Sequence, residues 1–217
     1  MFPLVPKVPL GTPAGTILFE TGWLRVMYTA TRGNSPAALA NRGQPMQKKT
    51  ETDKALARKI PEQVVLVTTR SADGAANAMA VGWVAVASSN PAMFVLGIDD
   101  EAYTYELIRA TKQFVVAYPS ELMGMETMHV GTHHGRGRDK IAECGLATQP
   151  ATVVRAPLIA EAVANFECEL VDIYRPGDCP LVVGKILVAH ENADASVKRL
   201  YTVAPGPTMG GVRPVVP

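Results

Sequence analysis

Short apolar segments separated by turn residues follow one another along most of this chain. The first, residues 64–70, reads V-V-L-V-T-T-R and is rich in β-branched residues, which suit a buried strand. Asp73-Gly74 then supplies a tight turn, and residues 76–83 return as the second strand of a hairpin. The pattern therefore predicts an antiparallel sheet assembled from neighbouring strands.

Further strands are predicted at residues 93–98, 114–118, 165–170 and 181–190. In the third of these, alternation indicates that Phe166, Cys168 and Leu170 face the core, whereas Glu167 and Glu169 face solvent. Predicted strands outnumber predicted helices, and hairpins outnumber crossover helices. This favours a mainly β, antiparallel barrel with short peripheral helices over a doubly wound sheet.

Three short helices are predicted from the spacing of apolar residues and from capping residues. The first covers residues 103–111, where Thr104 is the expected cap. The second opens at Ser120, and the third is capped by Asp139 and ends at Gly145. The side chains expected along one helical face are Tyr103, Leu107 and Ala110 in the first helix and Leu122, Met125 and His129 in the second.

Composition narrows the kinds of partner. With 47% hydrophobic and 19% charged residues, the chain is typical of a globular protein, and its net charge of +1 argues against general nucleic-acid binding. No segment reaches the roughly 18 consecutive apolar residues of a spanning helix, and prolines interrupt the apolar N-terminus. Three cysteines without a CxxC pair favour a reducing compartment. We therefore expect a soluble, cytoplasmic protein that binds neither nucleic acid nor a membrane.

Three segments are expected along the chain. Residues 1–45 hold several Pro and Gly residues and form an N-terminal arm or an upstream extension, with strand-like pieces at residues 17–19 and 23–28. Residues 46–203 form the main domain, and Met46 lies near its natural start. Residues 204–217 form a Pro- and Gly-rich tail on the surface.

Several common catalytic and binding motifs are absent. No G-x-G-x-x-G follows a strand, and no G-x-x-x-x-G-K-[ST] occurs, which excludes the usual dinucleotide and triphosphate cradles. There is also no G-x-S-x-G nucleophile elbow and no H-E-x-x-H zinc motif.

Residues 129–140, H-V-G-T-H-H-G-R-G-R-D-K, concentrate histidine, glycine and basic residues. A metal site is disfavoured because glycines interrupt the histidines and no carboxylate or cysteine pair supports them. An anion site is favoured by backbone N–H groups exposed at the glycines and by Thr132, Arg136, Arg138 and Lys140. A solvated basic loop explains the same residues equally well, so the stretch by itself leaves both interpretations open.

Residues 77–91 combine small side chains with hydrogen-bonding groups. Small residues at 78, 80, 82, 85 and 87 keep one strip of the chain low, so a flat ring system has room against the backbone. Asn77, Ser88 and Ser89 offer polar side chains beside that strip. Ordinary packing of a barrel interior accounts for the small residues as well.

Four motifs taken in order resemble the flavin reductase-like, FMN-binding split-barrel family, especially its flavoredoxin branch. They are V-V-L-V-T-T, N-A-M-A-V-G-W, A-Y-T-Y-E-L-I-R and G-T-H-H-G-R-G-R-D-K-I-A-E-C-G-L, within about residues 61–190. The resemblance implies a six-stranded antiparallel split barrel that forms a homodimer and binds FMN near the subunit interface. It also implies an NAD(P)H-dependent flavin or ferric reductase, or a related electron carrier; the alternative is a non-catalytic FMN-binding or storage protein.

By the same resemblance, the cofactor contacts fall into three groups and no side chain is assigned as catalytic. The residues implied at the flavin ring are a strand and the Ser88-Ser89 loop that follows it: Asn77, Met79, Ala80, Val81, Gly82, Trp83, Ser88 and Ser89. Tyr103 and Thr104, at the start of the next helix, are implied near the flavin too. The residues implied at the phosphate or ribityl side are Thr132, His133, His134, Gly135, Arg136, Asp139 and Lys140. One position departs from the family, which commonly has a histidine where this chain has Cys179 in G-D-C-P-L.

Overall fold

A computed structural model describes residues 17–21, 24–28, 47–206 and 208–213. The chain divides into two compact units, residues 1–50 and 51–217. In the first unit, β1 (Ile17–Thr21) pairs antiparallel with β2 (Leu24–Tyr28), which confirms strands in the two strand-like pieces. The boundary expected between residues 45 and 46 lies at the edge of the undescribed residues 29–46, so it stays a prediction.

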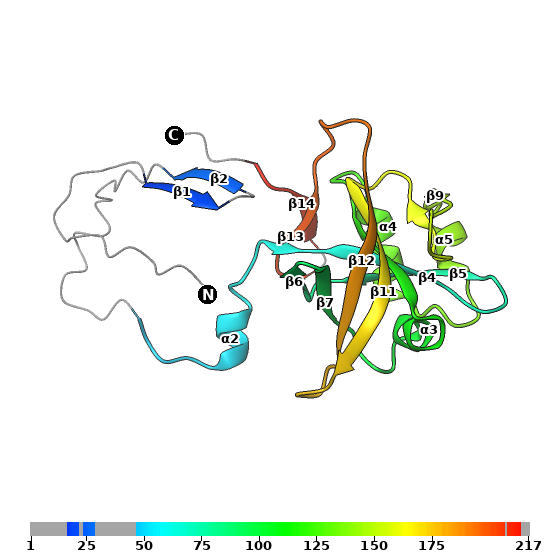
Figure 1. Cartoon of the computed structure of the whole chain (residues 1–217). Helices are drawn as coiled ribbons and strands as arrows, with labels where there is room; N and C mark the ends of the chain where they lie inside the picture. The colour runs from blue at the N-terminus through cyan, green and yellow to red at the C-terminus, as the bar shows by residue number, and fades with distance from the viewer. Residues whose placement is uncertain (1–16, 22–23, 29–46, 207, 214–217) are drawn as a thin grey trace. The chain divides into compact units, whose positions relative to one another are not determined.

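The second unit is built on a seven-stranded antiparallel sheet in the order β5-β4-β8-β11-β12-β7-β6 (Figure 1). Its strands are β4 (Val65–Arg70), β5 (Ala76–Val81), β6 (Val84–Ser89), β7 (Ala92–Gly97), β8 (Gln113–Tyr118), β11 (Ala164–Tyr174) and β12 (Leu181–Glu191). Outside this sheet lie two small ones: β3 (Glu62–Gln63) with β13 (Leu200–Ala204) and β14 (Thr208–Gly211), and β9 (Thr148–Gln149) with β10 (Leu158–Ile159). Part of the expected tail is thus a strand paired with β13.

The connection from β5 to β6 forces the large sheet to curl. These two strands lie at opposite edges of the sheet, yet only Gly82 and Trp83 separate them in the chain. A flat sheet of this width would place its edge strands roughly 29 Å apart at about 4.8 Å per strand. The short connection spans only about 10 Å at about 3.5 Å per residue. The edges therefore approach each other, as in a split barrel, and the predicted barrel is confirmed.

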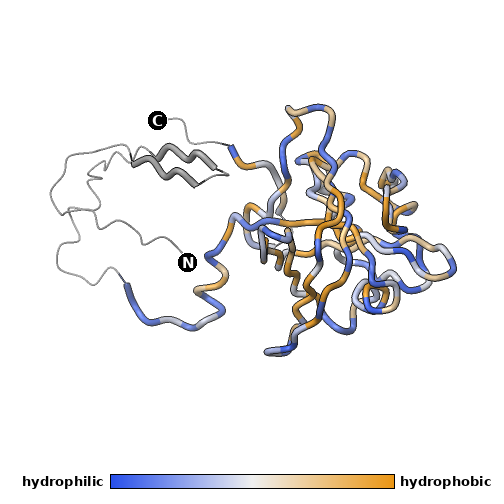
Figure 2. The backbone as a smooth tube through the Cα atoms, in the orientation of Figure 1, coloured by the Kyte–Doolittle hydropathy of each residue, from blue (hydrophilic) through white to orange (hydrophobic). Residues whose placement is uncertain are grey.

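The barrel interior is filled by apolar and aromatic side chains from the central strands, which are the hydrophobic segments of Figure 2. The ring of Phe166 meets those of Phe94 and Tyr118 edge-on, at 5.2 Å between centroids in each pair. Phe114 lies against Gly184 of β12, where any Cβ would overlap its ring. Close packing of this kind holds β5 and its neighbours rigid.

Helices gather at the β4–β5 side of the sheet (Figure 1). They are α3 (Tyr103–Thr111), α4 (Gly124–Thr132) and α5 (Lys140–Glu143), while α2 (Thr52–Leu56) buries no residue. A second apolar cluster, which includes Leu66, Val130 and Ile141, packs α4 and α5 onto the sheet. Among the described residues, none of the helices has the length and apolarity needed to cross a membrane.

One expectation about the sheet is not confirmed, and two others are wrong. The sheet has seven strands, and the six-stranded count is not confirmed; Ser88 and Ser89, expected in a loop, lie in β6 opposite Met93 and Ala92. Glu167, expected to face solvent, is fully buried. A register shift between Glu167 and Cys168 breaks the alternation there, so the side chains of these two consecutive residues are both buried.

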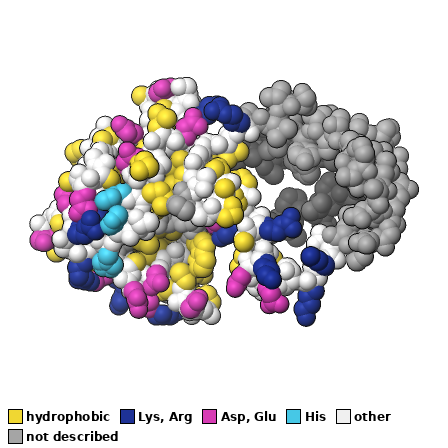
Figure 3. All heavy atoms as spheres, turned by 180° about the vertical axis from the view of Figure 1, so that it is seen from behind, with side chains coloured by type: hydrophobic (Ala, Val, Ile, Leu, Met, Phe, Trp, Pro, Cys, Tyr) yellow, Lys and Arg dark blue, Asp and Glu magenta, His cyan; other side chains and the backbone are white. Residues whose placement is uncertain are grey.

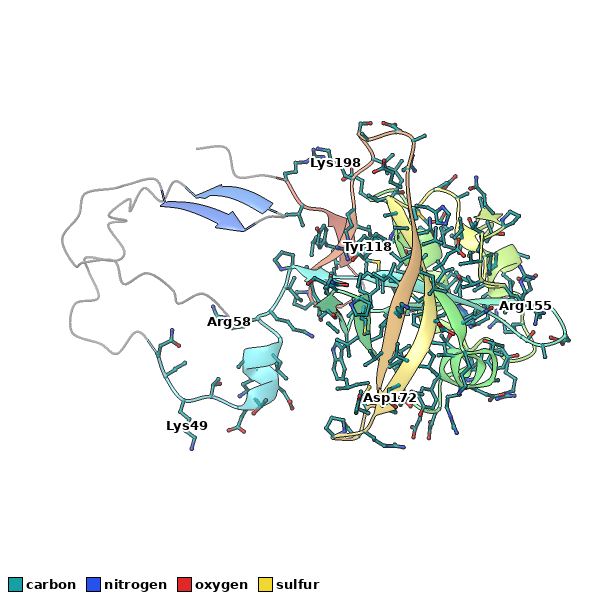
Figure 4. All side chains as sticks on the ribbon, viewed as in Figure 1. Lys49, Arg58, Tyr118, Arg155, Asp172 and Lys198 are labelled. Atoms are coloured by element: carbon teal, nitrogen blue, oxygen red, sulfur yellow. The ribbon has the colours of Figure 1, made fainter. Side chains whose placement is uncertain are left out.

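The buried Glu167 carboxylate anchors a loop. It accepts hydrogen bonds from the backbone N–H groups of residues 152, 153 and 154, at 2.6–2.9 Å, and lies 2.7 Å from His190 Nε2. Burial by itself would raise the pKa of Glu167, but these donors outweigh it and lower the pKa to about 2. The same loop carries Arg155, labelled in Figure 4, which donates to the carbonyls of Ser71 and Ala72.

The helix predictions were right in place and partly wrong in detail. Residues 103–111 form α3, but its N-cap is Ala102, Thr104 lies inside the first turn, and Ala110 is exposed. The second helix begins at Gly124 rather than Ser120. Leu122 and Met125, expected along one face of that helix, are 88% and 81% exposed, so they do not define its buried face. Asp139 caps α5 as expected, accepting from the Ala142 N–H at 3.0 Å.

Candidate functional site

A pocket of about 290 Å³, the inner pocket, lies where β5, the start of α3 and the end of α4 meet. Buried side chains form its floor and the glycine- and histidine-rich segment forms its wall. The lining residues are Asn77, Met79, Ala102, Tyr103, Thr104, Val130, Gly131, Thr132, His133, His134, Gly135 and Lys140.

Asn77 is the most distinctive polar group of the inner pocket. Its side-chain nitrogen donates to the hydroxyls of Thr104 at 2.9 Å and Thr69 at 3.3 Å, whereas its side-chain oxygen is buried without a partner. That oxygen faces Gly135, where a Cβ would overlap it. Because threonine hydroxyls both donate and accept, the amide group can present either its oxygen or its nitrogen to a ligand.

Lys140 is buried at the wall of this pocket, with 4% of its surface exposed. Its ammonium group donates to the carbonyl oxygens of Val130 and His133, both at 2.8 Å, and so ties down the end of α4. An ammonium has three donors, so one remains for a ligand. Burial, and then the nearby charge of Arg138, lowers the pKa of Lys140 to about 8.

The histidines bond mainly within their own segment. The rings of His129 and His133 stack with centroids 4.3 Å apart, and His133 Nδ1 lies 2.9 Å from the carbonyl oxygen of His129. His129 Nε2 lies 3.1 Å from the Glu143 carboxylate. Within the part of the chain that the structure describes, no three His, Cys, Asp or Glu side chains are grouped to hold a metal ion.

Both arginines of the basic segment form ion pairs with carboxylates. Arg138 makes two hydrogen bonds to Glu143, at 3.0 and 2.6 Å, which raise the pKa of Arg138 and lower that of Glu143. Arg136 pairs with Glu106 of α3 and lies over the ring of Tyr103, 5.0 Å from its centroid. Figure 3 shows histidines among both basic and acidic side chains along one edge of the molecule, so the segment is not a bare cationic surface.

A second and larger hollow, the outer hollow, of about 640 Å³, adjoins the inner pocket and shares Met79 with it. The end of β5 forms its floor, where Ala80 and Gly82 are small and Trp83 is 60% exposed. Five carboxylates, one thiol and one more glycine complete the lining: Glu62, Asp99, Asp100, Glu101, Asp178, Cys179 and Gly97. Lys59 and Arg175 pair with Glu62 and Asp100, at 2.7 and 2.5 Å, and among the described residues the other three carboxylates have no such pair.

Cys179, where the resemblance led us to expect a histidine, lines the outer hollow. Burial, and then the charges of Asp99 and Asp178, raises the pKa of its thiol. The side chain therefore remains an uncharged thiol at neutral pH, unlike the titratable imidazole it replaces.

The structure brings most of the predicted site residues together. Thirteen of the seventeen line the inner pocket or the outer hollow. Ser88 and Ser89 lie at the far end of β6, Asp139 serves as a helix cap, and Arg136 lies beside the inner pocket without lining it. The sequence motifs missed the acidic side of the outer hollow, which begins two residues after the end of β7 as Asp99-Asp100-Glu101.

Comparison with known proteins places these observations in one family. Residues 57–204 match the family description "Flavin reductase like domain". An uncharacterised protein of Pyrococcus abyssi is 37% identical over 127 residues, which is 58% of this chain and 72% of the relative.

Two solved structures share the fold at low sequence identity. The flavoredoxin of Desulfovibrio vulgaris superposes with a TM-score of 0.67 at 22% identity, over 79% of this chain and 96% of that one. An FMN-binding protein from Thermus thermophilus has a TM-score of 0.68 at 18% identity, over 80% of this chain and 100% of that one.

Proposed function

The chain belongs to the family of flavin reductase-like domains, and on that premise we propose that it binds FMN and passes hydride or electrons through it from NADH or NADPH to an acceptor. The inner pocket takes the ribityl phosphate tail. The outer hollow receives the flavin ring along β5, together with the redox partner.

The observation that carries this proposal is the unpartnered oxygen of Asn77 opposite Gly135. A buried polar atom without a partner costs about 1–3 kcal/mol, so a ligand in the pocket that Asn77 lines is favoured if it bonds to that oxygen. A ribityl hydroxyl can donate to the oxygen, and a phosphate can accept from the nitrogen after the amide turns. Either bond fits the tail of FMN.

Other groups around Asn77 suit an anionic tail. The hydroxyl of Thr104, which accepts from Asn77 and keeps its own proton free, lies along the same wall as the third donor of Lys140. The hydroxyl of Thr132 lines the wall too, but it already donates to the Met128 carbonyl. The N-terminus of the nine-residue helix α3 lies there too, and its free N–H groups and dipole favour negative charge. These groups are already held in place by the fold, so the protein would lose little conformational freedom when a ligand binds.

The floor of the outer hollow suits a flat ring. Ala80 and Gly82 keep the end of β5 low, and the hollow lies in the range of about 300–1,000 Å³ typical of small-molecule sites. When bound, FMN would supply the hydride-accepting chemistry. The role of β5 and Trp83 would be to orient the ring and exclude water from one face. Cys179 would lie at the rim as an uncharged side chain.

A homodimer is part of the proposal. The edge strand β6 and the residue directly before it carry exposed apolar side chains: Val86 is 68% exposed and Trp83 is 60% exposed. An exposed apolar edge strand is a liability that a second copy would cover. Because Trp83 also lines the outer hollow, such a contact would lie next to the proposed flavin ring.

The proposal is tested with the purified protein in two steps. The absorption spectrum before and after addition of FMN reports binding, and oxidation of NADH or NADPH with oxygen or a ferric chelate reports turnover. We expect both. Binding without turnover with either nucleotide would favour the non-catalytic alternative. Absence of flavin binding would refute the proposal.

A further inference from the structure

Resting on the proposed function, we infer that Glu106 sets the phosphate selectivity of the flavin site by competing with the ligand for Arg136. In the structure, Glu106 of α3 holds the guanidinium of Arg136 beside the inner pocket. A phosphate monoester has the same charge sign and bonding geometry toward arginine as this carboxylate. Glu106 therefore pairs with the guanidinium to which the ligand phosphate would otherwise bind.

The three cations of the basic segment differ in how firmly they are held. Lys140 is buried and bonded to two backbone carbonyls. Arg138 makes two bonds to Glu143, which His129 also contacts. Arg136 makes a single side-chain hydrogen bond, to Glu106, and the side chains of this pair are 61% and 53% exposed, against 44% and 33% for Arg138 and Glu143. Exposed ion pairs of this kind contribute about 0–1 kcal/mol, so Arg136 is the cation that is released most easily.

Arg136 also lies close enough to serve the inner pocket. Its guanidinium lies over the ring of Tyr103, and its own backbone N–H donates to His134 Nδ1 at 3.2 Å. Both Tyr103 and His134 line the pocket. Rotation of the Arg136 side chain about its own bonds would move its donors from Glu106 toward a phosphate, with no movement of the backbone.

The test compares FMN with riboflavin, which lacks the phosphate, in equilibrium titrations of the full-length protein. We expect Glu106→Gln to bind FMN roughly two- to fivefold more tightly, because the competing charge is gone. Riboflavin affinity should not change. Arg136→Met should weaken FMN about tenfold or more and leave riboflavin unaffected, because a charge-assisted bond to phosphate is lost.

The matched control is Glu143→Gln, which removes the other carboxylate partner of the segment without touching the pocket lining. It should leave the ratio of FMN to riboflavin affinity within twofold of wild type. In the double variant Glu106→Gln with Arg136→Met, the gain from Glu106→Gln should vanish, and circular dichroism checks that each variant is folded.

An unchanged or lower FMN-to-riboflavin ratio in folded Glu106→Gln would overturn the inference while leaving flavin binding in place. Equal gains in Glu106→Gln and Glu143→Gln would overturn it too, because they would reflect net charge alone. If the wild-type protein binds neither flavin, the proposed function fails and this inference fails with it.

Discussion

The inner pocket and the outer hollow share Met79 but differ in how far their side chains are buried and in their charge. Buried groups of the inner pocket are fixed by hydrogen bonds to the fold, and one buried amide oxygen is left without a partner. The outer hollow is wider, carries an exposed tryptophan and is bordered by carboxylates. The difference indicates a division of labour: the inner pocket would provide affinity for the cofactor, and the outer hollow would select what exchanges electrons with it.

Filling the inner pocket should have the largest effect. Gly135→Ala places a methyl group against the Asn77 amide, and we expect FMN affinity to fall about 10- to 100-fold, since overpacking typically costs 1–3 kcal/mol. Titration of flavin fluorescence measures the loss. Gly124→Ala is the matched control, because a Cβ there meets no atom within 4 Å and should change little. Equal affinity in the two variants would mean that the cofactor tail lies elsewhere.

The charge of Lys140 should make the inner pocket sensitive to pH. Its pKa is lowered to about 8, so the cation is present at neutral pH and is lost as pH rises through 8. A bound phosphate favours the charged form, so FMN affinity should be weaker at pH 9 than at pH 7 by up to about tenfold. Riboflavin titrated in parallel should bind equally at both pH values. A flat FMN profile would exclude Lys140 as a phosphate contact.

Neutralising the outer hollow should leave cofactor affinity nearly intact and change turnover instead. In the double variant Asp99→Asn with Glu101→Gln, we expect FMN affinity within about twofold of wild type. Because the carboxylates repel the phosphates of the nucleotide, kcat/KM with NADPH should rise about two- to fivefold, and less with NADH. Steady-state kinetics at low and high salt measure both. A large loss of FMN affinity would break the distinction between the two regions.

The smallest effect is expected from Cys179→His, which introduces the residue that the sequence resemblance implies at this position. FMN affinity should stay within about twofold of wild type, because Cys179 lies in the outer hollow and not in the inner pocket. Turnover should gain a dependence on pH near 6–7 that the uncharged thiol cannot give. A pH profile identical to that of wild type would remove this position from the redox partner site.

Much of the frame could be predicted from the sequence because its signals are local. The β-branched run Val65–Arg70 and the turn at Asp73-Gly74 determine a hairpin without reference to the rest of the chain. No strand was predicted at β6, and Ser88 and Ser89 were expected in a loop, because Val84–Ser89 mixes valine with alanine and serine. Its place at the sheet edge depends on pairing with β7, which composition does not reveal.

The partners of the charged side chains at the site and in the core could not be predicted from the sequence, for a different reason. Glu106 and Arg136 are 30 residues apart, so no local pattern joins them. Glu167 looked like a solvent-facing residue of an alternating strand, yet a bulge and three backbone donors from a distant loop bury it. Sequence indicated which groups gather near the site, whereas their pairing follows from the three-dimensional packing.

A crystal structure of the protein with FMN would test the division between the two regions most directly. We predict the phosphate and ribityl chain in the inner pocket, within hydrogen-bonding distance of Asn77 and Thr104, and the flavin ring against Ala80 and Gly82. A tail bound in the outer hollow, or a ring inserted between Asn77 and Gly135, would contradict the account.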